Sequence, residues 1–359
     1  MEIIKKYEFE PDYTNIVKAA RNIPAPRLPL YEHNIDGGCM TAILGVNPYQ
    51  MIWSGDDDTI REGCRLYWSF WKMMGYDTAS FELCTTGAFY GGGSLGAHAP
   101  ATITDRDDFE KYPWDEIPDR YFELYGKIYK IFAEVCPPGM KAIGGPGNGI
   151  FEQTEDLVGY MDLCLLKSDD EELYADIFHK ISDVQTEIWR RFMDAEYNEV
   201  YCLPRFGDDL GFDTSTLISA DDIKEFVIPH YRRITDLVHA HGKPFLLHSC
   251  GNLFRVFDDI IKDGGIDAKH SNEDKIGHFS VWVEKYGDKI GNFGGIDTDV
   301  LCRFDHDYIR DYVLDSISRV NGHGGIAFGS GNSIPDYVPV DGYLAMVETV
   351  REWRGDRRI

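Results

Sequence analysis

The chain has 359 residues, of which 43% are hydrophobic, so it can bury a core large enough for one or two domains. Its formal net charge of -25 would repel nucleic-acid phosphates and an anionic membrane surface, and we exclude both as partners. No stretch is apolar and long enough for a signal peptide or a bilayer span, so we expect a cytoplasmic protein. The eight cysteines lack disulfide spacing, and we expect most of them to be reduced core residues, with one or two available to serve a metal.

Short apolar runs alternate along the chain with amphipathic stretches of helical length. Runs that are apolar throughout are typical of strands buried on both faces, as in a parallel sheet. Eight such runs are predicted strands: Arg27–His33, Ala79–Cys84, Lys141–Gly145, Glu199–Phe206, Pro244–Ser249, Ile266–His270, Lys289–Gly294 and Gly325–Ser330. Strict strand-helix alternation with eight units predicts a single (β/α)8 barrel domain over residues 1–359.

Three of the intervening stretches show helical periodicity most clearly. In Ala220–His241 the apolar residues recur at a spacing of three to four, which is typical of an amphipathic helix. Ser219 precedes this helix as a predicted N-cap, and Pro229 should kink it. Asp307–Arg319 and Gly342–Trp353 repeat the pattern.

The segment from 87 to 118 departs from this regularity. It is rich in Gly, Asp and Pro, and a loop of that length in a compact domain is usually a functional lid or an insertion. The alternative architecture is an open doubly wound sheet. No Gly-x-Gly-x-x-Gly follows a predicted strand, so dinucleotide binding has no support.

The ends of the predicted strands carry many groups that can ligate a metal or act in catalysis. In a (β/α)8 barrel the chemistry gathers at the carboxyl ends of the strands, where these groups would meet. Carboxylate, imidazole and thiol are the ligands of zinc. The strand-end residues are Glu32, His33, Glu82, Cys84, Asp208, Asp209, His248, Cys250, His270, Glu273, Asp297, Ser330 and Asn332.

The segment His248-Ser249-Cys250 is the most specific of these signals. Alternation along a strand sends residues i and i+2 to the same side, so the imidazole and the thiol could converge on one ion. A buried cysteine beside a hydrogen-bonded histidine would explain the same two residues. The pair ends a strongly apolar run, which favours the metal-site interpretation.

Several motifs, taken together and in this order, resemble the uroporphyrinogen decarboxylase superfamily. The resemblance covers the chain from about residue 200 to the C-terminus, and the first half more loosely. The motifs are Gly207-Asp208-Asp209-Leu210-Gly211, Leu217-Ile218-Ser219, Phe226-Val227-Ile228-Pro229, His248-Ser249-Cys250-Gly251-Asn252, Gly294-Gly295-Ile296-Asp297 and the segment from Gly324 through Pro335 and Pro339.

The resemblance implies a (β/α)8 barrel from one of two functional branches. One branch decarboxylates uroporphyrinogen without a metal, but its N-terminal Gln-Ala-Gly-Arg segment has no counterpart in Arg27–His33. The other branch uses zinc to move methyl groups to or from corrinoid proteins. Its coenzyme M enzymes use His-x-Cys and a second Cys, where this chain has His248, Cys250 and Ser330.

Because serine stands where the coenzyme M enzymes have their second cysteine, the resemblance does not identify the third metal ligand. We predict Glu273 as the third metal ligand, with Glu82, Asp209 and Cys84 as alternatives. One thiolate with an imidazole and a carboxylate makes a harder, more Lewis-acidic site than two thiolates, which suits an oxygen atom of the substrate.

The expected function is therefore a zinc-dependent methyltransferase of the kind found in O-demethylases. It would move a methyl group from a small donor, for which we expect a methoxylated aromatic ether, to the Co(I) corrinoid of a corrinoid-binding partner protein. The alternatives are a metal-free decarboxylase, a coenzyme M type methyltransferase and a non-catalytic relative. A homodimer is compatible with the sequence.

In addition to the metal ligands, we predict catalytic residues and substrate-binding residues. Asp209 and His270 are the predicted catalytic residues, although Asp209 could instead cap a helix and His270 could orient a metal ligand or fill the core. The predicted substrate-binding residues are Glu32, Tyr201, Phe206, Asp297 and Ser330, where Asp297 would equally serve to fix its loop.

Overall fold

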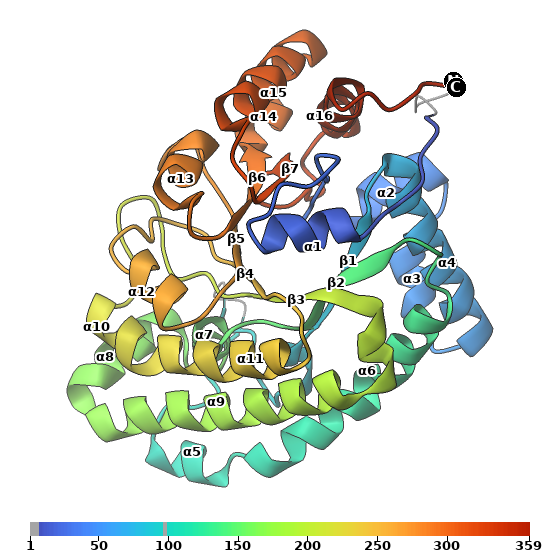
Figure 1. Cartoon of the computed structure of the whole chain (residues 1–359). Helices are drawn as coiled ribbons and strands as arrows, with labels where there is room; N and C mark the ends of the chain where they lie inside the picture. Colours follow the sequence, from blue (N-terminus) through green and yellow to red (C-terminus); the bar gives the residue numbers. More distant parts are fainter. Residues whose placement is uncertain (1–6, 96–98) are drawn as a thin grey trace.

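A curled, seven-stranded parallel sheet forms the centre of the computed structural model, which describes residues 7–95 and 99–359 (Figure 1). The strands lie in chain order across the sheet, as successive strand-helix units with right-handed crossovers require. They are β1 Thr78–Cys84, β2 Lys141–Gly147, β3 Tyr201–Gly207, β4 Leu246–His248, β5 Ala268–His270, β6 Gly291–Ile296 and β7 Ile326–Ser330.

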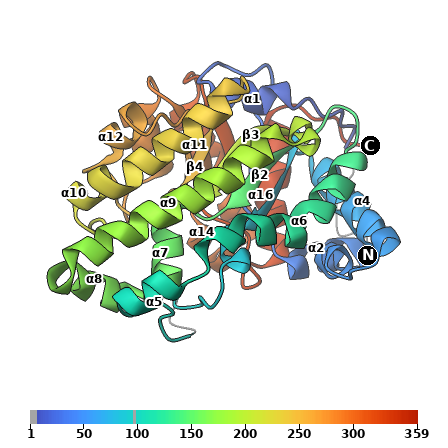
Figure 2. The ribbon, with the colours of Figure 1, turned by 90° about the horizontal axis from the view of Figure 1, so that it is seen from below.

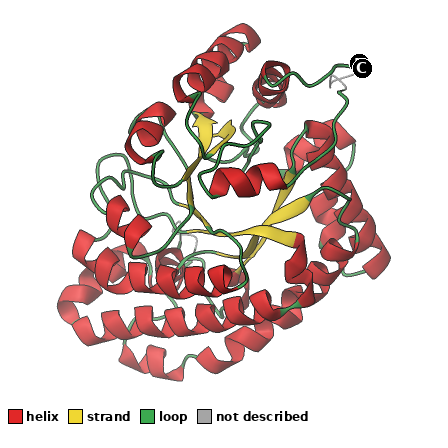
Figure 3. Cartoon of the chain, viewed as in Figure 1, coloured by secondary structure: helices red, strands yellow, loops and turns green. Residues whose placement is uncertain are grey.

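Helices surround the sheet on its outer face (Figure 3). The long helices α9 and α11 run beside one another along one side (Figure 2). The helices are α1 Thr14–Ala20, α2 Gly37–Leu44, α3 Pro48–Ile52, α4 Asp57–Met74, α5 Arg106–Lys111, α6 Ile117–Glu134, α7 Ile150–Val158, α8 Tyr160–Asp169, α9 Glu171–Asp194, α10 Ala220–Asp222, α11 Ile228–Ala240, α12 Phe257–Lys262, α13 Phe279–Tyr286, α14 Thr298–Arg303, α15 His306–Val320 and α16 Val340–Trp353. This arrangement is that of a (β/α)8 barrel, and the predicted fold class is confirmed.

Seven of the eight predicted strands are present, with ends within two residues of the predicted ones. The prediction was wrong for Arg27–His33, which makes a single parallel bridge to β7, at Leu30, and forms no regular strand. Pro29 within this run has no N–H and cannot donate to a ladder. The segment nevertheless lies where the eighth strand of a barrel would lie, because Tyr31 N donates to the Phe328 carbonyl at 2.9 Å.

The close approach of this segment to β7 depends on Gly329. A Cβ atom at this position would collide with the Tyr31 carbonyl oxygen and crowd the Glu32 carboxyl group. We expect Gly329→Ala to lower the free energy of unfolding by about 1–3 kcal/mol, the usual cost of forcing extra volume into a packed site. Urea denaturation would measure this. Gly126→Ala, whose new Cβ comes no nearer than 4.0 Å to the nearest neighbour, is the matched control and should not destabilise.

The helix predicted over Ala220–His241 begins where it was predicted to begin, but its middle differs from the prediction. Ser219 caps the helix by accepting a hydrogen bond from Asp222 N at 3.1 Å. A π-helical turn at Ile223–Val227 then separates α10 from α11, so the predicted single helix is divided. Pro229 lies in the first turn of α11, where its missing N–H costs no helical hydrogen bond. The helices α15 and α16 are likewise confirmed.

Two clusters of buried side chains hold the fold together. The larger one lies mainly between the sheet and its helices. The smaller one includes Ile16 and Ala20 of α1 with Leu203, Leu246 and Phe293 of the strands, so α1 covers one end of the sheet. The carboxyl ends of the strands lie at the opposite end, and their side chains are the ones free to build a site.

Among the described residues, no helix is both long and apolar enough to cross a membrane.

Candidate metal and substrate site

Three potential metal ligands converge where β3 and β4 end. The donor atoms of Asp209, His248 and Cys250 all lie within 4.8 Å of one another. Cys250 Sγ is 3.5 Å from His248 Nε2, and Asp209 Oδ1 is 3.6 Å from the same nitrogen. A thiol, an imidazole and a carboxylate at this spacing form a donor set of the kind that binds zinc.

A chain of hydrogen bonds fixes which nitrogen of His248 can ligate a metal. His270 Nε2 is 3.1 Å from the Ser330 carbonyl oxygen, which can only accept, so this nitrogen carries the proton. His270 Nδ1 is then the acceptor in its 2.8 Å contact with His248 Nδ1. His248 Nδ1 therefore donates, and the lone pair of His248 Nε2 points toward Cys250 and Asp209.

Both imidazoles are held neutral, as this chain of hydrogen bonds requires. Burial lowers the pKa of His270 to about 3. Burial, and then the neighbouring His270, lowers the pKa of His248 well below its ordinary value. A neutral imidazole is the form that ligates a metal.

The main chain and neighbouring side chains hold the other two donors in place. Asp209 Oδ1 accepts a hydrogen bond from Cys250 N at 2.8 Å, which ties the ends of β3 and β4 together. Asn332 Nδ2 and Ser271 Oγ contact Cys250 Sγ at 3.3 Å and 3.5 Å. Burial, and then the charge of Asp209, raises the pKa of the Cys250 thiol well above its ordinary value. This crowding of acidic groups would be relieved by a bound cation.

The neighbouring Asp208 has a different task. Its carboxylate accepts hydrogen bonds from Glu152 N at 2.9 Å and from Tyr231 Oη at 2.7 Å, so it covers the first turn of α7. Glu152 in turn accepts a hydrogen bond from Asp209 N at 3.2 Å. One aspartate of the pair is thus structural, whereas the other faces the donor set.

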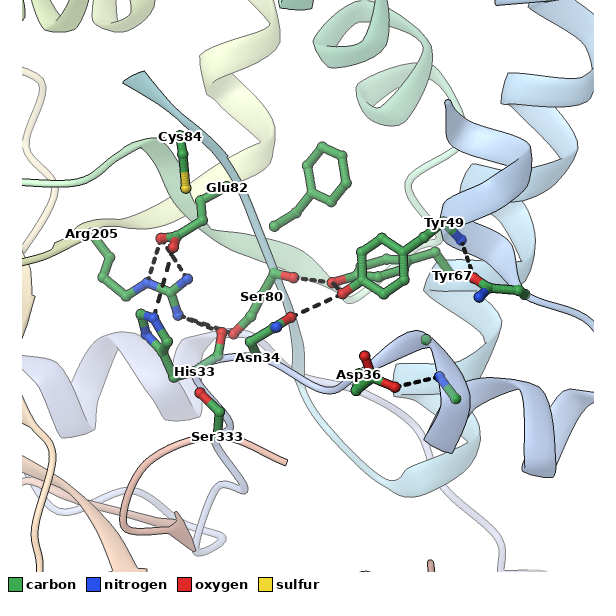
Figure 4. Close-up of a pocket in the computed structure, with 14 residues that line it drawn as sticks. His33, Asn34, Asp36, Tyr49, Tyr67, Ser80, Glu82, Cys84, Arg205 and Ser333 are labelled. Carbon is green, nitrogen blue, oxygen red and sulfur yellow. Dashed lines mark hydrogen bonds and ion pairs between the residues drawn. The ribbon is translucent and has the colours of Figure 1, made fainter. Parts of the chain in front are cut away.

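A cavity of about 730 Å³, whose lining residues are drawn in Figure 4, lies on the side of the N-terminal helices, and the donor set lies outside its lining. His33 links the two, because its ring lines the cavity and stacks on the His248 ring with centroids 3.8 Å apart. The other residues that line the cavity are Asn34, Asp36, Gly37, Gly38, Asn47, Tyr49, Tyr67, Ser80, Phe81, Glu82, Cys84, Arg205 and Ser333.

Arg205 is the only described lining residue with a permanent positive charge, and its guanidinium already has several partners (Figure 4). Its Nε and Nη2 donate to Glu82 Oε2 at 3.1 Å and 2.6 Å. Its Nη1 donates to Tyr31 Oη and to the His33 carbonyl, both at 2.9 Å. Arg205 is 1% exposed, so its charge is removed from water. Its ion pair with Glu82 neutralises that charge inside the protein.

Several predicted site residues lie elsewhere. Tyr201 and Phe206 pack against the surrounding helices, contacting Tyr129 and Phe192 in the first case and Trp189 in the second, and neither lines the cavity. Phe206 follows the inward-facing Arg205, so strand alternation turns it outward.

The remaining predicted residues have structural contacts. Asp297 caps α14 through Asp299 N at 2.8 Å and also accepts from Asp274 N at 2.7 Å. Among the described residues, two groups of potential ligands converge: the donor set above, and the rings of His33, His248 and His270. Glu273 belongs to neither group, although its charge helps to raise the pKa of the Cys250 thiol. Glu32 and Ser330 are buried and bonded to one another.

The sequence predicts no functional role for the residues on the side of α2 and α3. Asp36 and Asn47 cap these two helices, and Tyr49 reaches the Asn34 side chain at 3.0 Å. A capping residue before Gly37 and another before Pro48 are visible in the sequence. They predict helix starts, but they do not reveal that the two helices form the wall of a cavity.

The fold and the site define a (β/α)8 barrel with a histidine, cysteine and aspartate donor set where the strands end. The chain belongs to the uroporphyrinogen decarboxylase (URO-D) family, whose model matches residues 90–353. None of the curated protein sequences matches it.

Two solved structures are similar to this chain at low sequence identity. A methyltransferase from Methanosarcina mazei superposes with a TM-score of 0.68 at 16% identity, covering 96% of this chain and 99% of that one. A B12-independent methionine synthase from Shewanella sp. W3-18-1 gives a TM-score of 0.46 at 12% identity, covering 94% and 98%. At 16% identity the similarity to the methyltransferase concerns the fold.

Proposed function

We propose that this chain is a zinc-dependent methyltransferase that moves a methyl group from a small methyl ether to the Co(I) corrinoid of a partner protein. The observation that carries the proposal is the donor set of Asp209, His248 and Cys250, with the His248 lone pair directed into it. Membership of the URO-D family is compatible with this branch, and the methyltransferase of the same fold favours it.

The three donors would hold the ion, and Asp209 takes the place for which the sequence favoured Glu273. Glu273 remains a candidate for a fourth position. When bound, zinc supplies Lewis acidity toward the oxygen of the departing alcohol or phenol. A donor set with a single thiol is suited to that harder atom.

The cavity supplies the binding site for the methyl donor, which we propose to be a methoxylated aromatic ether. Tyr49 and Tyr67 offer aromatic walls, and their hydroxyl groups are held within the protein by Asn34 and by the Ser80 carbonyl. Such walls would orient a flat ring and exclude water from the reacting oxygen. The corrinoid-binding partner would then dock over the strand ends, where the methyl group must leave.

The alternative functions fit the site less well. A decarboxylase needs free cations for the carboxylates of its substrate, whereas Arg205 is engaged by Glu82. A coenzyme M type site needs a second thiolate, whereas Ser330 occupies that position in the chain and its hydroxyl is directed to Glu32.

Metal analysis of the purified protein tests the proposal. We expect about one zinc per chain in the wild type and loss of zinc in Cys250→Ala and His248→Ala, because two of three ligands cannot hold the ion tightly. His306→Ala, a substitution of an exposed histidine, is the control and should retain zinc. A wild-type protein that stays metal-free after zinc is added would refute the proposal.

A further inference from the structure

We infer that Glu32 is a positioning residue that sets the metal-ligating tautomer of His248 through Ser330 and His270. The inference deepens the proposed function and rests on it. No atom of Glu32 belongs to the donor set, so its effect would pass entirely through hydrogen bonds.

Glu32 holds Ser330 by two hydrogen bonds at once. Glu32 Oε1 accepts from Ser330 N at 2.8 Å, and Glu32 Oε2 contacts Ser330 Oγ at 2.5 Å. Both residues are fully buried, and Glu32 comes from the irregular segment that closes the sheet beside β7. A buried carboxyl group is costly, and burial raises the pKa of Glu32 to about 8. Two well-formed hydrogen bonds offset part of that cost.

The orientation of Ser330 then determines the protonation of both histidines. The Ser330 carbonyl accepts from His270 Nε2, which leaves His270 Nδ1 to accept from His248 Nδ1. If the Ser330 carbonyl could turn away from His270 Nε2, His270 could carry its proton on Nδ1 instead. His248 Nδ1 would then accept this hydrogen bond, and the single ring proton of His248 would lie on Nε2. In that tautomer Nε2 has no lone pair with which to ligate a metal. Outer contacts of this kind typically change metal affinity 10- to 100-fold.

The experiment compares Glu32→Leu with Glu32→Gln. Glutamine can accept from Ser330 N and donate to Ser330 Oγ, so it preserves both contacts, whereas leucine removes both. Zinc dissociation constants, measured by competition with a chelator, should rise about 10- to 100-fold in Glu32→Leu and stay within about threefold in Glu32→Gln. Nitrogen NMR of the metal-free proteins should show the single His248 tautomer lost in the leucine variant alone, with signals assigned from His248→Gln and His270→Gln.

Each outcome separates this inference from the proposed function. A folded Glu32→Leu protein with wild-type zinc affinity and an unchanged tautomer overturns the role of Glu32. If Glu32→Leu does not fold, Ser330→Ala removes one of the two contacts and should show a smaller shift of the same sign. If the wild type binds no zinc, the proposed function fails, while the NMR measurement still decides whether Glu32 sets the tautomer.

The charges in the cavity carry a second inference, which comes from a different observation and also rests on the proposed function. We propose that the methyl donor carries no carboxylate and is an uncharged methoxyphenol or a relative of it. Among the described lining residues, the ionisable carboxyl groups are Asp36 and Glu82, and the positive charge of Arg205 is neutralised by Glu82. An added anion would find no free cation among these residues and would face Asp36.

Binding of a matched pair of compounds tests this second inference. 4-Hydroxy-3-methoxybenzamide should bind the zinc-loaded protein at least about tenfold more tightly than the corresponding benzoate in calorimetry, because the two differ chiefly in charge. Asp36→Asn should narrow that ratio while preserving the helix cap, since asparagine caps as well as aspartate. Tighter binding of the benzoate overturns the inference and leaves the proposed function standing. Failure of both compounds to bind overturns the aromatic ether as donor.

Discussion

Replacement of Cys250 by alanine is expected to lower methyl transfer to a reduced corrinoid protein by about a thousandfold or more. Cys250 is one of three donors within 4.8 Å of one another, and its loss would remove the ion along with the thiol. Lewis-acid stabilisation of a departing oxygen amounts to several kcal/mol, and each 1.4 kcal/mol, roughly, is a factor of ten in rate. Single-turnover absorbance changes of the corrinoid would measure the rate.

The control for this experiment is Cys302→Ala. Cys302 lies on α14, away from the donor set, and should retain the wild-type rate. Wild-type turnover in Cys250→Ala would exclude a zinc-centred mechanism at this position. A rate lost in both variants would instead indicate general damage to the fold.

Loss of the Arg205 side chain is expected to cause the largest change in stability. Arg205→Met would leave the Glu82 carboxylate, which is 18% exposed, without the two N–H groups that donate to its Oε2. Breaking one half of a buried ion pair typically costs about 3–5 kcal/mol, because the remaining charge stays desolvated. The same change removes the contacts to Tyr31 and to the His33 carbonyl, which hold the irregular N-terminal segment against the sheet.

A double-mutant cycle in urea separates the two contributions. Arg205→Met combined with Glu82→Gln should recover part of the lost free energy of unfolding, since no uncompensated charge then remains. Full additivity of the two single changes would mean that the ion pair contributes nothing. A loss below about 1 kcal/mol in Arg205→Met would contradict the buried-pair interpretation.

The sequence by itself determined the parts of this protein that depend on local pattern. The apolar runs fixed seven strands, because a strand buried on both faces leaves a continuous apolar signature. The same reasoning placed His248 and Cys250 together at the end of β4, since residues two apart on a strand share a side. Strand ends that carry carboxylate, imidazole and thiol indicated the end of the sheet where the chemistry would lie.

Only the tertiary structure decided which of those strand-end residues meet. Asp209 lies beside Cys250 because the ends of β3 and β4 are tied by its hydrogen bond to Cys250 N, whereas Glu273 follows β5 in a turn of its own. His33 stacks on His248, from which it is separated by most of the chain, because the proline-containing segment closes the sheet without being a strand. Contacts of this kind follow from the closure of the sheet, and no local periodicity encodes them. The tautomer of His248 is likewise set by residues from three separate segments, Glu32, His270 and Ser330.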